Sequence, residues 1–153
     1  MAGDPAIVKV TEAATALFRE GMGINVFVDR SEDDPIREEE RPAMAIRCVQ
    51  IEFTPAMGQG EMLHECTFDF DFYEEDLTFG GISANLSRMI ARGNALVAAD
   101  RTLGGMLQQF ELRTATAELD ATPDLGCAIL TAEISFLTPR DDFTTILGAS
   151  GIF

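Results

Sequence analysis

The chain has 153 residues, of which 46% are hydrophobic and 24% are charged, the balance expected of one globular domain with a single core. Its 26 Asp and Glu residues against 11 Lys and Arg residues give a formal net charge of -15. This excess of negative charge repels nucleic-acid phosphates and anionic lipid headgroups, which argues against direct binding to DNA, RNA or a membrane surface. An acidic protein that binds a basic host partner remains compatible with this composition.

The first residues and the cysteines indicate a cytoplasmic site of synthesis. Residues 1–5 lack the basic and apolar regions of a secretory signal, and no apolar run approaches the roughly 20 residues that a membrane span needs. Cys48, Cys66 and Cys127 are odd in number and lie among apolar residues of predicted strands. We therefore expect no membrane partner, and reduced core cysteines in place of a disulfide framework or a metal site.

The N-terminal third predicts a helix, a strand and a long acidic loop. Asp4 is placed to cap a helix that has Pro5 in its first turn and two glycines at its end. Residues 24–28 have the composition of a strand. Residues 29–42 contain many acidic residues and two prolines, which predicts an extended, solvated loop.

Two further strands follow. Residues 44–53 are strand-like, but their apolar phase changes between Cys48 and Val49, which indicates a β-bulge or burial of both faces. After a hairpin loop at residues 55–60, residues 62–73 alternate strictly between apolar and polar side chains. Each phenylalanine on the apolar side contributes roughly 1.5 to 3 kcal/mol on burial, so the register of this strand is well determined.

The second half predicts a helix and two more strands. An apolar stripe over residues 82–97 is typical of a helix that covers a sheet, and residues 110–116 and 128–136 alternate as strands joined by a turn. Hairpins interrupted by helices predict an α+β fold, with a mainly antiparallel sheet of about five strands and two helices packed on one face. The predicted order is α-β-β-β-α-β-β, within a single domain at residues 1–138.

Residues 139–153 form a C-terminal tail that is too short to make its own core. Such a tail needs apolar surface, either on its own domain or on a neighbouring subunit, and the sequence leaves both alternatives open. The second alternative makes its large apolar residues candidates for a subunit interface. These residues are Phe143, Ile146, Leu147, Ile152 and Phe153.

The sequence contains no recognisable catalytic arrangement. The single histidine, His64, lies on the phenylalanine side of its strand, where a hydrogen-bonded core role is more typical than a general base. No nucleophile elbow, zinc-protease, P-loop or dinucleotide-binding motif is present. We therefore predict no catalytic residue, no cofactor and no metal. An alternative of another class, a small carboxylate-based metal-binding protein or enzyme, is left open by Asp69, Asp71 and residues 74–76.

The acidic residues also allow a structural role. If carboxylates line a channel in an assembly, their repulsion prevents DNA from adhering to the wall as it passes. The candidates for such lumen-facing or partner-facing positions are Asp69 and Asp71 on the polar side of their strand, and Glu38, Glu39 and Glu40 in the acidic loop.

Four segments within residues 80–138 together resemble the tail terminator (tail completion) proteins of long-tailed bacteriophages. They are the predicted helix, its exit Ala99-Asp100-Arg101-Thr102-Leu103-Gly104-Gly105, the 110–116 strand, and the final strand Ile129-Leu130-Thr131-Ala132-Glu133-Ile134-Ser135-Phe136. Residues 5–73 agree with the family in layout alone. The family's last strand often closes on an aromatic-Arg-Thr ending, whereas this chain has Phe136-Leu137-Thr138-Pro139 and lacks the arginine.

The resemblance implies a structural virion protein. Such a subunit assembles into a homo-hexameric ring at the head-proximal end of the tail, caps the tail tube, stops its polymerisation and provides the head-tail joining surface. Its implied partners are the tail tube protein and head-tail connector proteins, and DNA passes through without specific binding. The protein would be assembled in the host cytoplasm. A tail tube subunit or a head-tail connector is the nearest alternative, and the source is left open between phage, prophage and gene-transfer particle.

Overall fold

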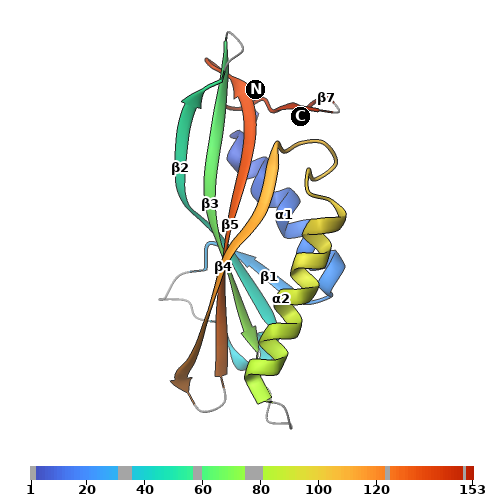
Figure 1. Cartoon of the computed structure of the whole chain (residues 1–153), viewed down its shortest axis with the longest axis vertical. Coiled ribbons are helices and arrows are strands. Elements are labelled where there is room, and N and C mark those ends of the chain that lie inside the picture. Colours follow the sequence, from blue (N-terminus) through green and yellow to red (C-terminus); the bar gives the residue numbers. More distant parts are fainter. Residues whose placement is uncertain (1–2, 31–35, 57–59, 75–80, 123–124, 150) are drawn as a thin grey trace.

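The computed structural model describes residues 3–30, 36–56, 60–74, 81–122, 125–149 and 151–153, with side chains at 38, 74, 81–83, 85–86, 117–122 and 125–127 outside the description. Two helices and a set of long strands account for most of these residues (Figure 1). In chain order the elements are α1 (Ala6–Met22), β1 (Asn25–Val28), a 3-10 turn η1 (Glu38–Glu40), β2 (Ala43–Pro55), β3 (Glu61–Glu74), α2 (Gly81–Ala99), β4 (Gln109–Thr122), β5 (Leu125–Pro139), β6 (Leu147–Gly148) and β7 (Gly151–Ile152).

The five longer strands form one sheet in the order β1-β2-β3-β5-β4. Three neighbouring pairs are antiparallel, whereas β1 pairs in parallel with the first residues of β2. The predicted α+β class, the mainly antiparallel five-stranded sheet and the order α-β-β-β-α-β-β are therefore confirmed. The short β6–β7 hairpin in the C-terminal tail was not predicted.

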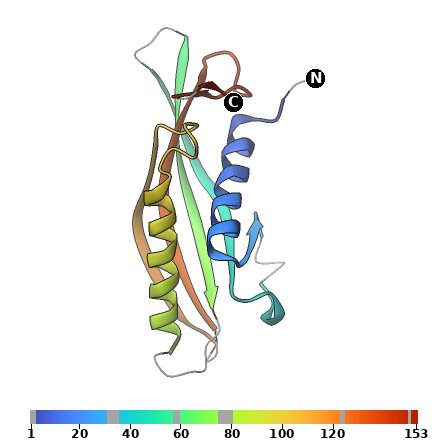
Figure 2. The same ribbon diagram turned by 90° about the vertical axis from the view of Figure 1, so that its right-hand side faces the viewer.

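Both helices cover the same face of the sheet and leave the other face bare (Figure 2). The alternation of β3 places its phenylalanines, Phe68, Phe70 and Phe72, against the helices, where each is fully buried. Gly21 in α1 allows a close approach of the helices, because a Cβ there would overlap the side chain of Leu96 in α2. The core therefore lies between one sheet face and two crossing helices.

Two local predictions have different outcomes. The register of β2 against β3 passes from Cys48–Phe68 to Gln50–Thr67, so Val49 is the extra residue of a β-bulge, as the change of phase indicated. The expected Asp4 cap was wrong, since Pro5 is the N-cap residue and no side chain caps α1. The physical reason is that the Ala6 amide donates to the Phe143 carbonyl at 2.7 Å, so the C-terminal tail satisfies this helix end.

The C-terminal tail packs on its own domain. Ile146 and Phe153 exchange two backbone hydrogen bonds of 3.0 and 2.9 Å, and the Ile146 side chain is fully buried. The Ala149 amide donates to the Gly105 carbonyl at 2.8 Å, and Lys9 Nζ donates to the Thr144 carbonyl at 2.7 Å. The turn after α2 and helix α1 thus both hold the tail.

Candidate assembly surface

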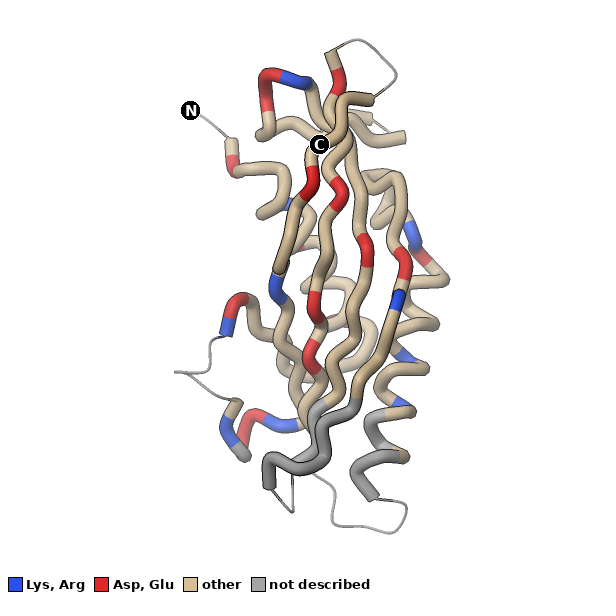
Figure 3. The backbone as a smooth tube through the Cα atoms, turned by 60° about the vertical axis from the view of Figure 1, so that its left-hand side comes forward, with Lys and Arg blue, Asp and Glu red and all other residues tan. Residues whose placement is uncertain are grey.

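The bare face of the sheet is acidic (Figure 3). The strand register places Glu52 opposite Glu65 and Glu111 opposite Glu133 on this face. Like charges directly opposite each other destabilise a strand pair, so these carboxylates are not there to stabilise the sheet. The role of these carboxylates in an assembly stays a prediction.

Asp69 and Asp71 lie on the same bare face, as their alternation predicted. Both face Arg47 of β2, with nitrogen to oxygen distances of 3.8 Å for Asp69 and 3.4 Å for Asp71. Asp69 also accepts a hydrogen bond of 3.2 Å from the Thr131 hydroxyl. Asp71 is buried, so of the two predicted residues Asp69 presents more charge to the surface. A lumen-facing role for either residue stays a prediction.

Arg113 of β4 is a second base that the described residues place on this face. Its guanidinium lies 2.7 Å from the Glu133 carboxylate and 3.0 Å from that of Glu111. The hydrogen bond to Glu133 is the main cause of a raised pKa for Arg113. Arg113 thus partly offsets the Glu111–Glu133 repulsion, whereas Glu52 and Glu65 are exposed and form no ion pair within the described part of the chain. The part of the β2–β3 pair that carries Glu52 and Glu65 is therefore the most negative part of the described face.

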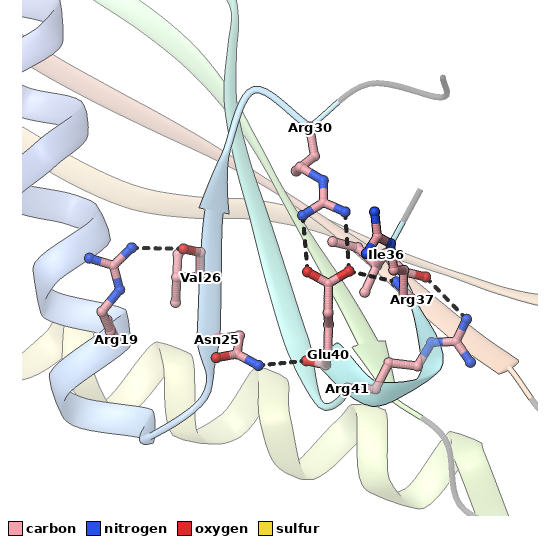
Figure 4. Close-up of polar contacts among 8 residues, drawn as sticks. All are labelled: Arg19, Asn25, Val26, Arg30, Ile36, Arg37, Glu40 and Arg41. Carbon is pink, nitrogen blue, oxygen red and sulfur yellow. Dashed lines mark hydrogen bonds and ion pairs between the residues drawn. The ribbon is translucent and has the colours of Figure 1, made fainter. Parts of the chain in front are cut away.

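Glu38, Glu39 and Glu40 form η1, at the edge of the sheet. The Glu40 carboxylate accepts two hydrogen bonds of 3.2 Å from Arg30 and one of 2.9 Å from the Arg37 amide (Figure 4). The Arg30 hydrogen bond is the main cause of a lowered pKa for Glu40. Glu40 therefore holds the start of β2 next to β1, while Glu39 is exposed and the side chain of Glu38 is outside the described residues.

His64 is a core residue, as its position predicted. Its side chain is 3% exposed and its Nε2 lies 2.9 Å from the Thr138 hydroxyl. The imidazole stacks on Phe136 and meets Phe53 and Phe143 edge-on, with ring centroids 4.6, 5.1 and 4.5 Å away. Burial lowers the pKa of His64, so the neutral ring is the stable form in this apolar site.

Cys48 on β2 and Cys66 on β3 are free thiols, and Cys48 Sγ donates a hydrogen bond of 3.5 Å to the Gln50 carbonyl. Interaction with Cys48, together with burial, raises the pKa of the Cys66 thiol, and interaction with Cys66 lowers that of Cys48. Cys66 is therefore an unreactive core residue, as predicted. The side chain of Cys127 lies outside the described residues.

The five predicted interface residues divide into two groups. Ile146 is fully buried in its own domain, and Leu147 and Phe153 are half-buried there. Phe143 is 39% exposed and stacks on Phe53 with ring centroids 5.3 Å apart, and Ile152 is 76% exposed. Any contact between subunits through this tail therefore falls mainly to Phe143 and Ile152, and that role stays a prediction.

Two apolar grooves at the sheet edges escaped the sequence analysis. The β2 groove, of about 780 Å³, lies between α1, β1 and β2 and includes the exposed side chains of Val8, Val28, Val49 and Phe53. The β4 groove, of about 370 Å³, lies between α2 and β4 and is lined by residues such as Ile90, Ala91, Leu112 and Ala115. The predicted bulge at Val49 was the one sequence signal for the β2 groove, because the extra residue of a bulge departs from the regular alternation of side chains.

The alternative metal site has limited support. Within the described residues, no group of three or more His, Cys, Asp or Glu side chains is placed to hold a metal ion. Asp69 and Asp71 instead face Arg47, and Glu75 and Asp76 lie outside the described part of the chain. Among the described helices, neither is long and apolar enough to cross a membrane.

Comparison with known proteins gives a likeness at the level of structure alone. No protein-family model and no curated protein matches the chain. A solved structure titled "Virion of native gene transfer agent (GTA) particle" contains a chain that is similar with a TM-score of 0.41 and 14% identity, over 84% of this chain and 90% of that chain. This identity and this TM-score are too low to assign a family or a function.

Proposed function

We propose that this chain is a structural virion protein, specifically a tail terminator that acts without catalysis. Six copies would form a ring that caps the tail tube at its head-proximal end, stops its polymerisation and offers the surface for head-tail joining. The partners would be the tail tube protein and head-tail connector proteins. The proposal rests on the sequence resemblance of residues 80–138 and on the surface described above.

The observation that carries the proposal is the asymmetry of the two sheet faces. Both helices cover one face, whereas the other is bare and carries Glu52, Glu65 and Glu133 at exposed positions. A ring with its helices outward would turn the acidic faces of all copies toward the hole. At about 0.1 M salt the Debye length is roughly 10 Å, so such a wall repels DNA phosphates near it without binding them.

The decisive experiment compares tails assembled with and without the protein by negative-stain microscopy. A terminator predicts tails of uniform length in its presence and overlong tails in its absence. Tails of unchanged length would contradict the terminator role. Long filaments of the protein itself would support a tube subunit, and binding to portal-bearing heads without tails would support a connector.

The acidic wall has its own test. The double variant Glu52→Gln/Glu65→Gln removes two exposed carboxylates from the bare face, whereas the control variant Asp4→Asn/Glu20→Gln removes two exposed carboxylates near the ends of α1. Particles with the double variant should assemble normally but deliver DNA more slowly, with a larger deficit than the control. Equal delivery by both variants and the wild type would contradict the proposed lumen face.

A further inference from the structure

We propose that copies of this chain join head to tail through the two free edges of the sheet, so that the β2 edge of one copy pairs with the β4 edge of the next. The apolar grooves beside the two edges would close on each other in this contact. The inference rests on the proposed ring and specifies which surfaces form it.

The first edge is the outer side of β2 beyond its pairing with β1. β1 pairs only with residues 43–46, and the last hydrogen bond runs from the Asp29 amide to the Ile46 carbonyl at 2.9 Å. Among the described residues, no strand covers residues 47–55 on this side. Val49 and Phe53 are 51% and 52% exposed there, so this edge offers both unpaired backbone and apolar surface.

The second edge is the outer side of β4, the last strand of the sheet. Within the described part of the chain, β4 pairs with β5 alone. Ala115 is exposed on the helix side, next to the half-buried Leu112 and Ile90. The β4 edge therefore has the same construction as the β2 edge, a free strand flanked by an apolar groove.

The two edges match in height and in direction. Across the sheet, Arg47 pairs with Asp69, Asp69 with Thr131, and Thr131 with Thr114. The free part of β2, which begins at Arg47, therefore lies level with the part of β4 that ends at Thr114. Three successive antiparallel pairs separate the two strands, so β4 runs opposite to β2. A neighbour rotated about an axis along the strands would thus present β4 antiparallel to β2, and an antiparallel sheet would continue across the contact.

Composition favours a copy of the same chain as the occupant. The guanidinium of Arg113, the charged residue that lines the β4 groove, is bound to Glu111 and Glu133 on the bare face, so apolar side chains and free backbone carry the contact. Proteins usually protect exposed edges with Lys or Pro, but residues 47–54 and 109–122 contain neither. Because the two surfaces differ, the contact is heterologous and closes into a ring when the rotation permits.

The test uses one charge on each edge. Val49→Asp places a carboxylate in the β2 groove and Ala115→Asp places one in the β4 groove, while Ala98→Asp places one at an exposed position of α2 that lines neither groove. Circular dichroism checks that each variant folds. Light scattering and native mass spectrometry then measure the association of each protein alone and of the two edge variants mixed.

Each edge variant alone should associate roughly 30-fold or more weakly than wild type, the size of an interface hot spot, while Ala98→Asp should form the wild-type oligomer. An equimolar mixture of the two edge variants retains one intact β2–β4 contact per pair, so it should form dimers and no rings. A mixture that stays monomeric, or folded edge variants that still form the wild-type oligomer, would overturn the edge pairing.

These outcomes separate the inference from the proposed function. Closed rings that persist in both edge variants would leave a terminator possible and refute the edge contact alone. Edge-dependent association that produces open filaments would keep the edge contact and refute the terminator. A wild-type protein that stays monomeric at high concentration would contradict both.

Discussion

Replacing Ile146 by Ala should destabilise the isolated domain strongly. Ile146 is fully buried between the C-terminal tail and the rest of the chain, and its backbone exchanges two hydrogen bonds with Phe153. The substitution removes three carbon groups at roughly 0.8 kcal/mol each, so lost burial alone amounts to about 2.4 kcal/mol. The cavity left behind raises the expected loss to about 2–5 kcal/mol.

The matched control is Ile152→Ala. Ile152 is 76% exposed in the same tail, so its truncation should change the free energy of unfolding by no more than about 0.5 kcal/mol. Urea titration followed by circular dichroism gives both values, provided that the slope of the unfolding free energy against urea is the same in wild type and variants.

The comparison tests where the tail docks. Equal midpoints for the two variants would refute the reasoning that the tail packs on its own domain. A loss for Ile146→Ala that appears only at concentrations where the protein is oligomeric would show that the tail docks on a neighbouring subunit.

Three further substitutions test other parts of the structure. Gly148→Ala should cost about 1–3 kcal/mol, because its added Cβ would overlap the Gly105 carbonyl oxygen, and an unchanged thermal midpoint would contradict the packed hairpin. Burial lowers the pKa of His64 in the folded protein. The stabilising contribution of the neutral ring is therefore complete above the unfolded pKa of about 6.5 and declines below it. Unfolding free energies measured from pH 7.5 to 5 should fall less in His64→Phe than in wild type. Arg30 lowers the pKa of Glu40, so Glu40→Gln should be less stable than wild type at neutral pH. The stability of the variant should approach that of wild type as the pH falls through the folded pKa of Glu40. A constant difference in urea midpoint across that range would count against the ion pair.

Sequence patterns predicted the elements well because each pattern is local. The strict alternation of residues 62–73 determines which side of β3 faces the core. The change of phase at Val49 indicated a bulge or burial of both faces, and the structure has the bulge. The apolar stripe of α2 likewise determines which side of the helix is buried. These features depend on the chain within one element, so they could be predicted without knowledge of the fold.

Contacts between residues far apart in the sequence could not be predicted from local patterns. Asp69 and Asp71 have the same alternation, yet Asp71 is buried, and its Arg47 partner lies on a strand 24 residues earlier. The carbonyl that satisfies the start of α1 belongs to Phe143, at the other end of the chain. Such contacts follow from the order of strands and from tail docking, which no local pattern specifies.

The candidate site also combines features that local patterns predict with features that depend on the order of the strands. The acidity of the sheet face could be anticipated from Asp69, but the opposed glutamates depend on the register of separate strands. The two edge grooves depend on β1 being too short to cover β2, and on β5 rather than β4 lying next to β3. Sheet order therefore determines which surfaces remain for other subunits.

The most direct test of the account is electron microscopy of the purified wild-type protein, averaged to reveal subunit number and the orientation of the helices. The account predicts single closed rings of six copies, with the helices on the outside and the acidic sheet faces around the hole. Solitary subunits at high concentration, open filaments, or rings with helices lining the hole would contradict it.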